Sequence, residues 1–234
     1  PMLIVADVSD IVRIAKKHRA KVIIDNTFAT PWLYKPLKEG ADIVIHSATK
    51  YFSGHGNITA GVICGDDNKI MRSAIEYRKF VGHMLSPDDA YRLQTQLESF
   101  ELRFSRQCDN ASKLAGYLEK SALIGKVWFP GLKKHGTYNI AQKLFKGKGF
   151  GAMITFDFNG KDKIEKKIRR DKFIELVSEK IKLIPSLGDS RTILMPVEAV
   201  WGTKYPEPGM IRLSVGFEDY EILEETISGA LGQF

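Results

Sequence analysis

Ile45-His46-Ser47-Ala48-Thr49-Lys50-Tyr51 is the most informative segment of this chain. It ends an apolar run and leads into the glycine-bearing loop Ser53-Gly54-His55-Gly56, which indicates the end of a buried strand. A lysine at such a place can be desolvated and can reach a carbonyl carbon. The neighbouring hydroxyl groups of Ser47 and Thr49 can donate hydrogen bonds to an anion such as a phosphate. Lys50 is therefore the candidate catalytic residue.

The first hundred residues have the pattern of an α/β sheet. Short β-branched runs at residues 21–25, 42–46 and 60–65 are apolar rather than alternating, which is typical of strands covered on both faces in a parallel-rich sheet. Helical patterns flank these runs, one of them over residues 68–81, and Ser9 is expected to cap the first helix. The sequence therefore predicts an α/β domain at the amino-terminal side.

A long helical pattern separates this part from the rest. Ser86-Pro87-Asp88-Asp89 combines an N-cap residue, a proline and two acids at a helix start. From Ala90 to Leu118, apolar residues recur every three or four positions, which predicts one long helix, either straight or kinked, that bridges two domains. The remaining runs mix strands with helices, including an expected helix over residues 161–182. We therefore predict a boundary between residues 1–104 and a smaller α+β domain over residues 105–234.

Composition and charge exclude several classes of protein. Lys and Arg number 35 against 28 Asp and Glu, giving a net charge of +7, yet the densest basic block, residues 161–172, alternates with acids and apolar residues as a solvated helix face does. We expect no nucleic-acid partner and no membrane partner, and a cytoplasmic location, since no apolar run or leader pattern indicates otherwise. Cys64 and Cys108 lack metal-ligand spacing, so we expect reduced thiols and no metal.

Asp25 ends its predicted strand, as Lys50 follows the next one. Ligands of open α/β sheets bind outside the carboxyl ends of the strands, so both side chains are expected at one crevice. Pyridoxal 5'-phosphate needs a lysine for its Schiff base and a carboxylate beside its ring nitrogen. Taken singly, an Asp at a strand end is more often a turn former, and a lone lysine is usually a solvated charge. The two together predict a pyridoxal-phosphate site.

The surrounding motifs identify a family. The segments Val22-Ile23-Ile24-Asp25-Asn26-Thr27-Phe28-Ala29-Thr30-Pro31 and His46-Ser47-Ala48-Thr49-Lys50-Tyr51 resemble those of the cysteine and methionine metabolism family of fold-type I pyridoxal-phosphate enzymes. This family includes cystathionine γ-synthase, cystathionine γ-lyase, methionine γ-lyase and the O-acetylhomoserine sulfhydrylases. Further segments look like the same family in the same order: Leu85-Ser86-Pro87, Phe100-Glu101-Leu102-Arg103, Ser186-Leu187-Gly188-Asp189 and Ile211-Arg212-Leu213-Ser214-Val215-Gly216. Residues 1–104 would then be the C-terminal part of the family's large, cofactor-binding domain.

The resemblance implies a role for each cofactor-binding residue. Lys50 would form the Schiff base and then move protons between substrate carbons, and Asp25 would pair with the pyridine nitrogen. Ser47 and Thr49 would hold the phosphate. The histidines that flank the site, His46 and His55, are expected to serve loop structure rather than acid–base chemistry.

Two residues of the second half are implied in substrate binding. Arg212 would clamp the substrate α-carboxylate through the two parallel donors of its guanidinium, and Ser186 would support the same group. Without the resemblance, Arg212 is a charge at a strand end and Ser186 a loop residue.

The chain also departs from the family pattern. The family normally places a long segment before the point where this chain starts, with a tyrosine that stacks on the cofactor ring and further phosphate contacts. In addition, the segment Leu194-Met195-Pro196-Val197-Glu198-Ala199-Val200-Trp201-Gly202 stands where the family commonly has a His-Pro-Ala-Ser-like sequence, and the connection onward to Arg212 looks short. The assignment to a subfamily is therefore open.

The resemblance implies γ-elimination on a sulfur-containing or homoserine-derived amino acid such as methionine or cystathionine. The stretch Gly56-Asn57-Ile58-Thr59-Ala60-Gly61 favours a lyase. The alternatives are a γ-replacement synthase or sulfhydrylase that uses O-acylhomoserine, and a non-catalytic fragment of such an enzyme. The family further implies a homotetramer, built as a dimer of dimers with shared active sites.

Overall fold

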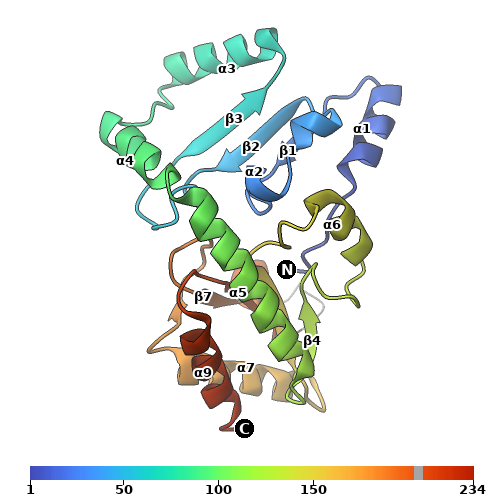
Figure 1. Ribbon diagram of the computed structural model, residues 1–234, viewed down its shortest axis with the longest axis vertical. Helices are drawn as coiled ribbons and strands as arrows, with labels where there is room; N and C mark the ends of the chain where they lie inside the picture. Colours follow the sequence, from blue (N-terminus) through green and yellow to red (C-terminus); the bar gives the residue numbers. More distant parts are fainter. Residues whose placement is uncertain (203–207) are drawn as a thin grey trace.

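The computed structural model describes residues 1–202 and 208–234 and contains two sheets there (Figure 1). The smaller sheet has the order β1-β2-β3, with β1 at Ile23–Asp25, β2 at Ile43–Ser47 and β3 at Gly61–Gly65. β1 and β2 are parallel, whereas β3 runs antiparallel to β2. The sheet is mixed because the segment from β2 to β3 contains no crossover helix, which a parallel pair would need.

One face of this sheet is open in the described chain. Ile23, Ile45 and Ile63 are 56%, 38% and 43% exposed, although Ile43 and Val44 are buried. The expectation that these strands are covered on both faces is therefore wrong for one of the faces. An apolar run indicates what a strand could bury, but the partner surface has to come from other segments.

The larger sheet belongs to the second half of the chain. Its order is β4-β5-β8-β7-β6, and each neighbouring pair is antiparallel except β6 and β7. Its strands are β4 at Ile124–Trp128, β5 at Met153–Phe158, β6 at Lys182–Leu183, β7 at Ile193–Pro196 and β8 at Ile211–Ser214. Every residue of β5 is buried, so this sheet has cover on both faces at its centre.

The first helices begin at caps other than the predicted one. Helix α1 spans Val8–Lys17, and its N-cap is Asp7, whose side chain accepts a hydrogen bond from the Asp10 amide. The prediction that Ser9 caps this helix is wrong. Ser9 lies within the helix, and its hydroxyl donates to the Glu39 carboxylate, thirty residues away, at 3.1 Å. The short helices α2 at Thr30–Leu33 and η1 at Pro36–Glu39 each have a proline in their first turn, and the apolar periodicity is too short to reveal them.

The long predicted helix is interrupted. Helix α4 spans Pro87–Leu97, helix α5 spans Phe100–Lys120, and Ser86 caps α4 as expected, accepting from the Asp89 amide at 3.1 Å. The guanidinium of Arg103 donates to the Gln96 carbonyl at 3.0 Å and so takes an acceptor that a continuous helix would use. The preceding helix, α3 at Asn68–Val81, was predicted with these bounds and contains no buried residue.

The remaining helices are α6 at Tyr138–Phe145, α7 at Lys163–Val177, α8 at Glu198–Trp201 and α9 at Tyr220–Leu231. Of these, α7, α8 and α9 lie against the larger sheet or its core, whereas α6 packs into the buried cluster that contains Val8 and Tyr34. Helix α7 is shorter than the predicted 161–182, because Asp162 caps its start and the chain turns after Val177 to enter β6.

Helix α5 starts beside the smaller sheet and runs down along the larger sheet (Figure 1). Phe104 and Cys108 on its first half belong to a buried cluster with Tyr51, whereas Leu114 and Leu118 on its second half belong to the cluster of the larger sheet. The boundary near residue 104 stays a prediction. Within residues 1–202 and 208–234, no helix combines the length and the hydropathy needed to cross a membrane.

Candidate functional site

Lys50 lies in the turn that follows β2. Its amide donates to the Ser47 carbonyl at 3.2 Å, and its own carbonyl accepts from the Gly54 amide at 2.7 Å. The side chain reaches across the molecule, where Nζ donates to Ser186 Oγ at 2.8 Å. Burial, and then the like charge of Arg212, lower the pKa of the Lys50 amine. The site therefore holds an amine that is neutral more readily than a surface lysine.

Arg212 lies on β8, the middle strand of the larger sheet. Its register partners are Thr155 on β5 and Met195 on β7. Its Nη2 atom donates to the Ser186 carbonyl at 2.7 Å, while its buried Nε has no partner in the described chain. Burial lowers the pKa of this guanidinium, so an incoming carboxylate would relieve an electrostatic cost.

The Ser186 loop is pressed against the backbone of Lys50. A Cβ atom on Gly188 would lie 2.6 Å from the Tyr51 amide nitrogen and 2.8 Å from the Lys50 carbonyl carbon. Gly188 has φ +78°, which favours glycine, and its amide donates to Ser214 Oγ at 2.8 Å. The sequence motif contains this glycine, but only the structure shows that it permits the contact on which the Lys50 and Ser186 pair depends.

Asp25 is held by a residue to which no role was assigned from the sequence. Its Oδ1 atom accepts from the Thr27 amide at 3.0 Å and from the Thr27 hydroxyl at 2.6 Å. The Thr27 Oγ1 atom in turn accepts from the Ser47 amide at 2.8 Å. The hydroxyl two residues after Asp25 was the available signal, because an Asp side chain commonly bonds to backbone two residues on. Thr27 thus fixes the carboxylate against the end of β2.

Thr49 differs from Ser47 in its surroundings. The Thr49 hydroxyl accepts from the Ala60 amide at 3.0 Å and approaches the Ala60 carbonyl at 3.3 Å. It therefore ties the Lys50 turn to the start of β3, and it would have to rotate away from Ala60 to donate to a phosphate. Ser47 is half-buried at the end of β2 and is the less constrained of the two hydroxyls.

The two histidines beside the site have different structural roles. His46 lies in β2, so its assignment to a loop was wrong; it is 5% exposed and stacks on Phe52 with the ring centroids 5.0 Å apart. Burial lowers the pKa of His46, which favours the neutral ring. His55 lies in the following loop as expected, with its Nδ1 atom 2.6 Å from the Ser53 carbonyl oxygen.

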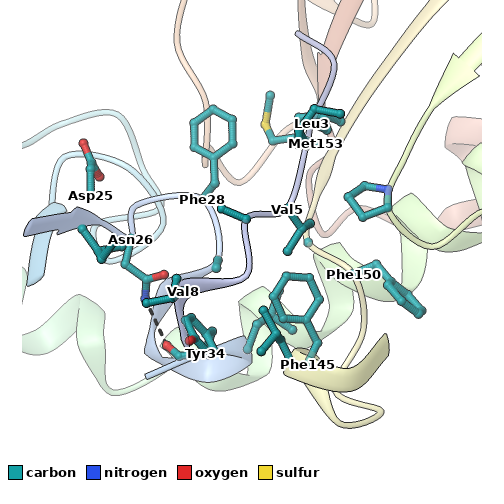
Figure 2. Close-up of a pocket in the computed structure, with 18 of the residues that line it drawn as sticks. Leu3, Val5, Val8, Asp25, Asn26, Phe28, Tyr34, Phe145, Phe150 and Met153 are labelled. Carbon is teal, nitrogen blue, oxygen red and sulfur yellow. Dashed lines mark hydrogen bonds between the residues drawn. The ribbon is translucent and has the colours of Figure 1, made fainter. Parts of the chain in front are cut away.

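An apolar cavity opens beside Asp25, as Figure 2 shows. It has a volume of about 260 Å³, and Phe28 lies on its wall near Asp25. The labelled apolar residues around it are Leu3, Val5, Val8, Phe145, Phe150 and Met153. Lys50 does not line this cavity, so the cavity and the Lys50 contact are separate features.

One series of hydrogen bonds nevertheless connects the predicted site residues. It runs from Asp25 through Thr27 to the Ser47 amide, continues from the Ser47 carbonyl to the Lys50 amide, and ends in the Ser186 contacts of Lys50 and Arg212. The desolvated amine of Lys50 suits the aldehyde of pyridoxal phosphate, and the oriented carboxylate of Asp25 suits its ring nitrogen. The guanidinium of Arg212, with its unpaired buried donor, suits the carboxylate of an amino acid. The donor set is therefore compatible with pyridoxal phosphate.

Solved structures place the fold in the class of pyridoxal-phosphate enzymes of trans-sulfuration. The cystathionine γ-synthase of Xanthomonas oryzae pv. oryzae, solved with cystathionine, matches with a TM-score of 0.91 at 29% identity, over 100% of this chain and 60% of that chain. The methionine γ-lyase of Micromonospora echinospora matches with a TM-score of 0.90 at 29% identity, over 99% of this chain and 60% of that chain.

Sequence relatives give the same class. An L-methionine γ-lyase of Fusobacterium nucleatum subsp. polymorphum is 37% identical over 94% of this chain and 57% of its own length. A cystathionine β-lyase of Lactococcus lactis subsp. cremoris is 34% identical over 99% of this chain and 61% of its own length. The family model described as Cys/Met metabolism PLP-dependent enzyme matches residues 1–232, and the chain belongs to that family. It spans about 57% to 61% of the length of these relatives.

Proposed function

We propose that this protein acts as a pyridoxal-phosphate-dependent lyase that catalyses γ-elimination on a sulfur-containing or homoserine-derived amino acid, such as methionine or cystathionine. The observation that carries the proposal is the Lys50 amine, desolvated and held at 2.8 Å from Ser186 beside Arg212. Relatives named as methionine γ-lyase and cystathionine β-lyase support elimination over replacement.

The cofactor, when bound, supplies an aldehyde that reacts with an amine and a ring that withdraws electrons from the substrate carbons. Lys50 is suited to that aldehyde because its lowered pKa increases the neutral fraction of the amine at a given pH. The same amine, once free, can accept a proton from one substrate carbon and return it to another. Lys50 is thus the proposed catalytic base and acid.

The other cofactor contacts follow from the residues around Lys50. The Asp25 carboxylate, oriented by Thr27, would stabilise a protonated ring nitrogen by charge. Ser47 would donate its hydroxyl to the phosphate, and Thr49 would do so after rotating away from Ala60.

Arg212 and Ser186 form the proposed substrate side of the site. The Arg212 guanidinium keeps its buried Nε unpaired and can bind a carboxylate through two parallel donors. Ser186 holds both Lys50 and Arg212, so it sets the spacing between the amine and the bound carboxylate. An arginine that binds a carboxylate beside the Lys50 amine favours amino acids as substrates.

The proposal includes a cytoplasmic homotetramer, a dimer of dimers with shared sites. The free thiols of Cys64 and Cys108 are compatible with a reducing compartment. The open apolar face that contains Ile45 and Ile63 is compatible with cover by further protein. Cell fractionation tests the location, and light scattering of the purified protein tests the oligomeric state.

A cofactor titration tests the site. Adding pyridoxal phosphate should give a band near the edge of the visible range, and borohydride reduction should attach the cofactor to the peptide that contains Lys50. Lys50→Ala should abolish both signals, whereas Lys133→Ala, at an exposed lysine, should leave them unchanged. A band that survives Lys50→Ala would sink the assignment, and a folded chain that shows no band would favour the non-catalytic fragment.

Product analysis tests the reaction type. Formation of 2-oxobutyrate and ammonia from methionine or cystathionine indicates γ-elimination, whereas pyruvate from cystathionine indicates β-elimination. A thioether formed from O-acylhomoserine and a thiol indicates the alternative, a γ-replacement synthase or sulfhydrylase.

A further inference from the structure

Arg103 is a buried guanidinium at the start of α5, and it faces the loop that follows Lys50. It is 6% exposed, and burial lowers its pKa. Its four hydrogen bonds all go to neutral oxygen atoms: the carbonyls of Tyr51, Phe52 and Gln96, and the hydroxyl of Ser99, each at 3.0 Å. A buried charge that is paired only with dipoles is costly, and a neutral residue could fill the same space more cheaply. The charge therefore needs another explanation.

The geometry of these bonds gives one. Tyr51 and Phe52 are consecutive, and two different nitrogen atoms of Arg103 bind their carbonyls, as the planar fork of a guanidinium allows and a single ammonium does not. The Gln96 carbonyl lies at the last turn of α4, where the helix dipole favours a cation. Arg103 thus joins the Lys50 loop to the break between α4 and α5.

The loop is shaped around this guanidinium. Gly54 has φ +69°, and a Cβ atom there would lie 1.8 Å from Arg103 Nη1. The Gly54 amide donates to the Lys50 carbonyl at 2.7 Å, and the Ser53 amide donates to the Ala48 carbonyl at 3.0 Å. The backbone of Lys50 is therefore enclosed by a turn that has Arg103 at its centre.

We propose that Arg103 is a positioning residue for Lys50: by binding the carbonyls of residues 51 and 52, it fixes the turn from which the lysine amine reaches Ser186. The inference rests on the proposed role of Lys50, but its test needs no cofactor. Loss of the guanidinium frees the turn, so the amine leaves Ser186. It also becomes less buried and more distant from Arg212, and these are the two causes of its lowered pKa.

Two measurements on the whole chain test the proposal. Hydrogen exchange followed by mass spectrometry reports the turn amides, and acylation of lysines across a pH series reports the ionisation of Lys50. In Arg103→Met, the turn that contains Ser53 and Gly54 should exchange about tenfold faster or more. The midpoint of Lys50 acylation should move to higher pH, since the pKa of Lys50 is lowered in the intact turn. Arg103→Lys should show a smaller form of both changes, because one ammonium cannot reach all the acceptors.

Arg170 provides the matched control. It is 8% exposed and pairs with Asp171 and Glu198. Its helix, α7, lies at the end of the molecule opposite the smaller sheet (Figure 1). Arg170→Met removes a buried guanidinium of similar exposure, so it should lower the stability while leaving the turn exchange and the Lys50 midpoint unchanged. Equal effects of Arg103→Met and Arg170→Met on Lys50 would overturn the proposal.

Gly54→Ala keeps the inference testable if Arg103→Met does not fold. The new methyl group displaces the guanidinium from the turn without removing it, and should shift turn exchange and the Lys50 midpoint in the same directions. Where Arg103→Met does fold, the two changes should not add in the double variant, as is usual for residues in contact. A folded Gly54→Ala protein with wild-type turn exchange and a wild-type Lys50 midpoint would contradict the proposal. Cofactor attachment measured in the same variants separates this outcome from a failure of the Lys50 assignment.

Discussion

The two sheets of this protein differ in how completely they bury their apolar residues. The larger sheet lies in a continuous core in which Phe156, Phe158 and Phe173 pack against one another with ring centroids 5.6 to 5.7 Å apart. The smaller sheet leaves Ile45 and Ile63 exposed on one face, and α3 buries no residue at all. The larger sheet therefore supplies most of the hydrophobic stabilisation, while the smaller one presents the turn that carries Lys50.

The largest expected effect is in the core of the larger sheet. Phe156→Ala removes a fully buried ring and should lower the free energy of unfolding by about 3 to 5 kcal/mol. Ile63→Ala, on the open face of the smaller sheet, should change it by no more than about 0.5 kcal/mol. Urea unfolding followed by circular dichroism measures both. Similar losses in the two variants would show that the open face is covered in solution.

A second effect is expected where the two halves meet. Gly188→Ala places a methyl group against Tyr51 at a positive φ and should cost about 1 to 3 kcal/mol, with a weaker Lys50 to Ser186 contact. The control is Gly116→Ala within α5, where a Cβ meets nothing within 4 Å and should stabilise the helix by up to about 1 kcal/mol. Thermal unfolding of the two variants measures the difference. A Gly188→Ala protein as stable as wild type would show that the Ser186 loop does not pack against the Lys50 backbone.

The N-cap residues of α7 and α3 should contribute less to stability than the core residues do. Asp162 caps α7, which buries Phe173, so Asp162→Ala should lower global stability by about 1 kcal/mol. Asp67 caps α3, which buries nothing, so Asp67→Ala should fray α3 and leave global unfolding almost unchanged. Urea unfolding reports the first effect, and hydrogen exchange of the α3 amides reports the second. A global loss from Asp67→Ala would mean that α3 has a partner surface.

The smallest expected effect is electrostatic. Arg212 is the second cause, after burial, of the lowered pKa of Lys50. Arg212→Met removes a like charge and stabilises the protonated amine, so the pKa of Lys50 should rise towards its ordinary value. The midpoint of Lys50 acylation against pH measures this shift, with Arg13→Met, at an exposed position, as the control. An unchanged midpoint in Arg212→Met would leave burial as the whole cause.

Much of the local structure could be predicted from the sequence. The strand that ends before Lys50, the cap at Ser86 and the bounds of α3 all depend on neighbours within a few residues. The sequence could not reveal the break between α4 and α5, because it depends on Arg103 meeting a loop about fifty residues earlier in the chain. The prediction of the α1 cap was wrong for the same reason, since the Ser9 hydroxyl donates to Glu39, which lies thirty residues away in the sequence.

The site shows the same division between local pattern and long-range contact. A lysine after one strand and an acid at the end of another singled out Lys50 and Asp25, because pyridoxal phosphate needs both groups. Arg212 was indicated only by the resemblance of its segment to the family. The match of the family model to residues 1–232 then confirmed the family. Motifs could not assign Thr27 as the residue that orients Asp25, because its hydroxyl is shared with the Ser47 amide of another strand.

From the sequence alone came most of the longer elements, the family and the chemical types of the candidate site residues, because periodicity, capping and motif spacing act over short stretches of chain. Only the tertiary structure decided which of those residues meet. Lys50 and Ser186 are 136 positions apart, and their 2.8 Å contact requires the bare backbone of Gly188 to lie against Tyr51. It likewise decided which apolar faces are buried, because burial depends on a partner surface that no local pattern encodes.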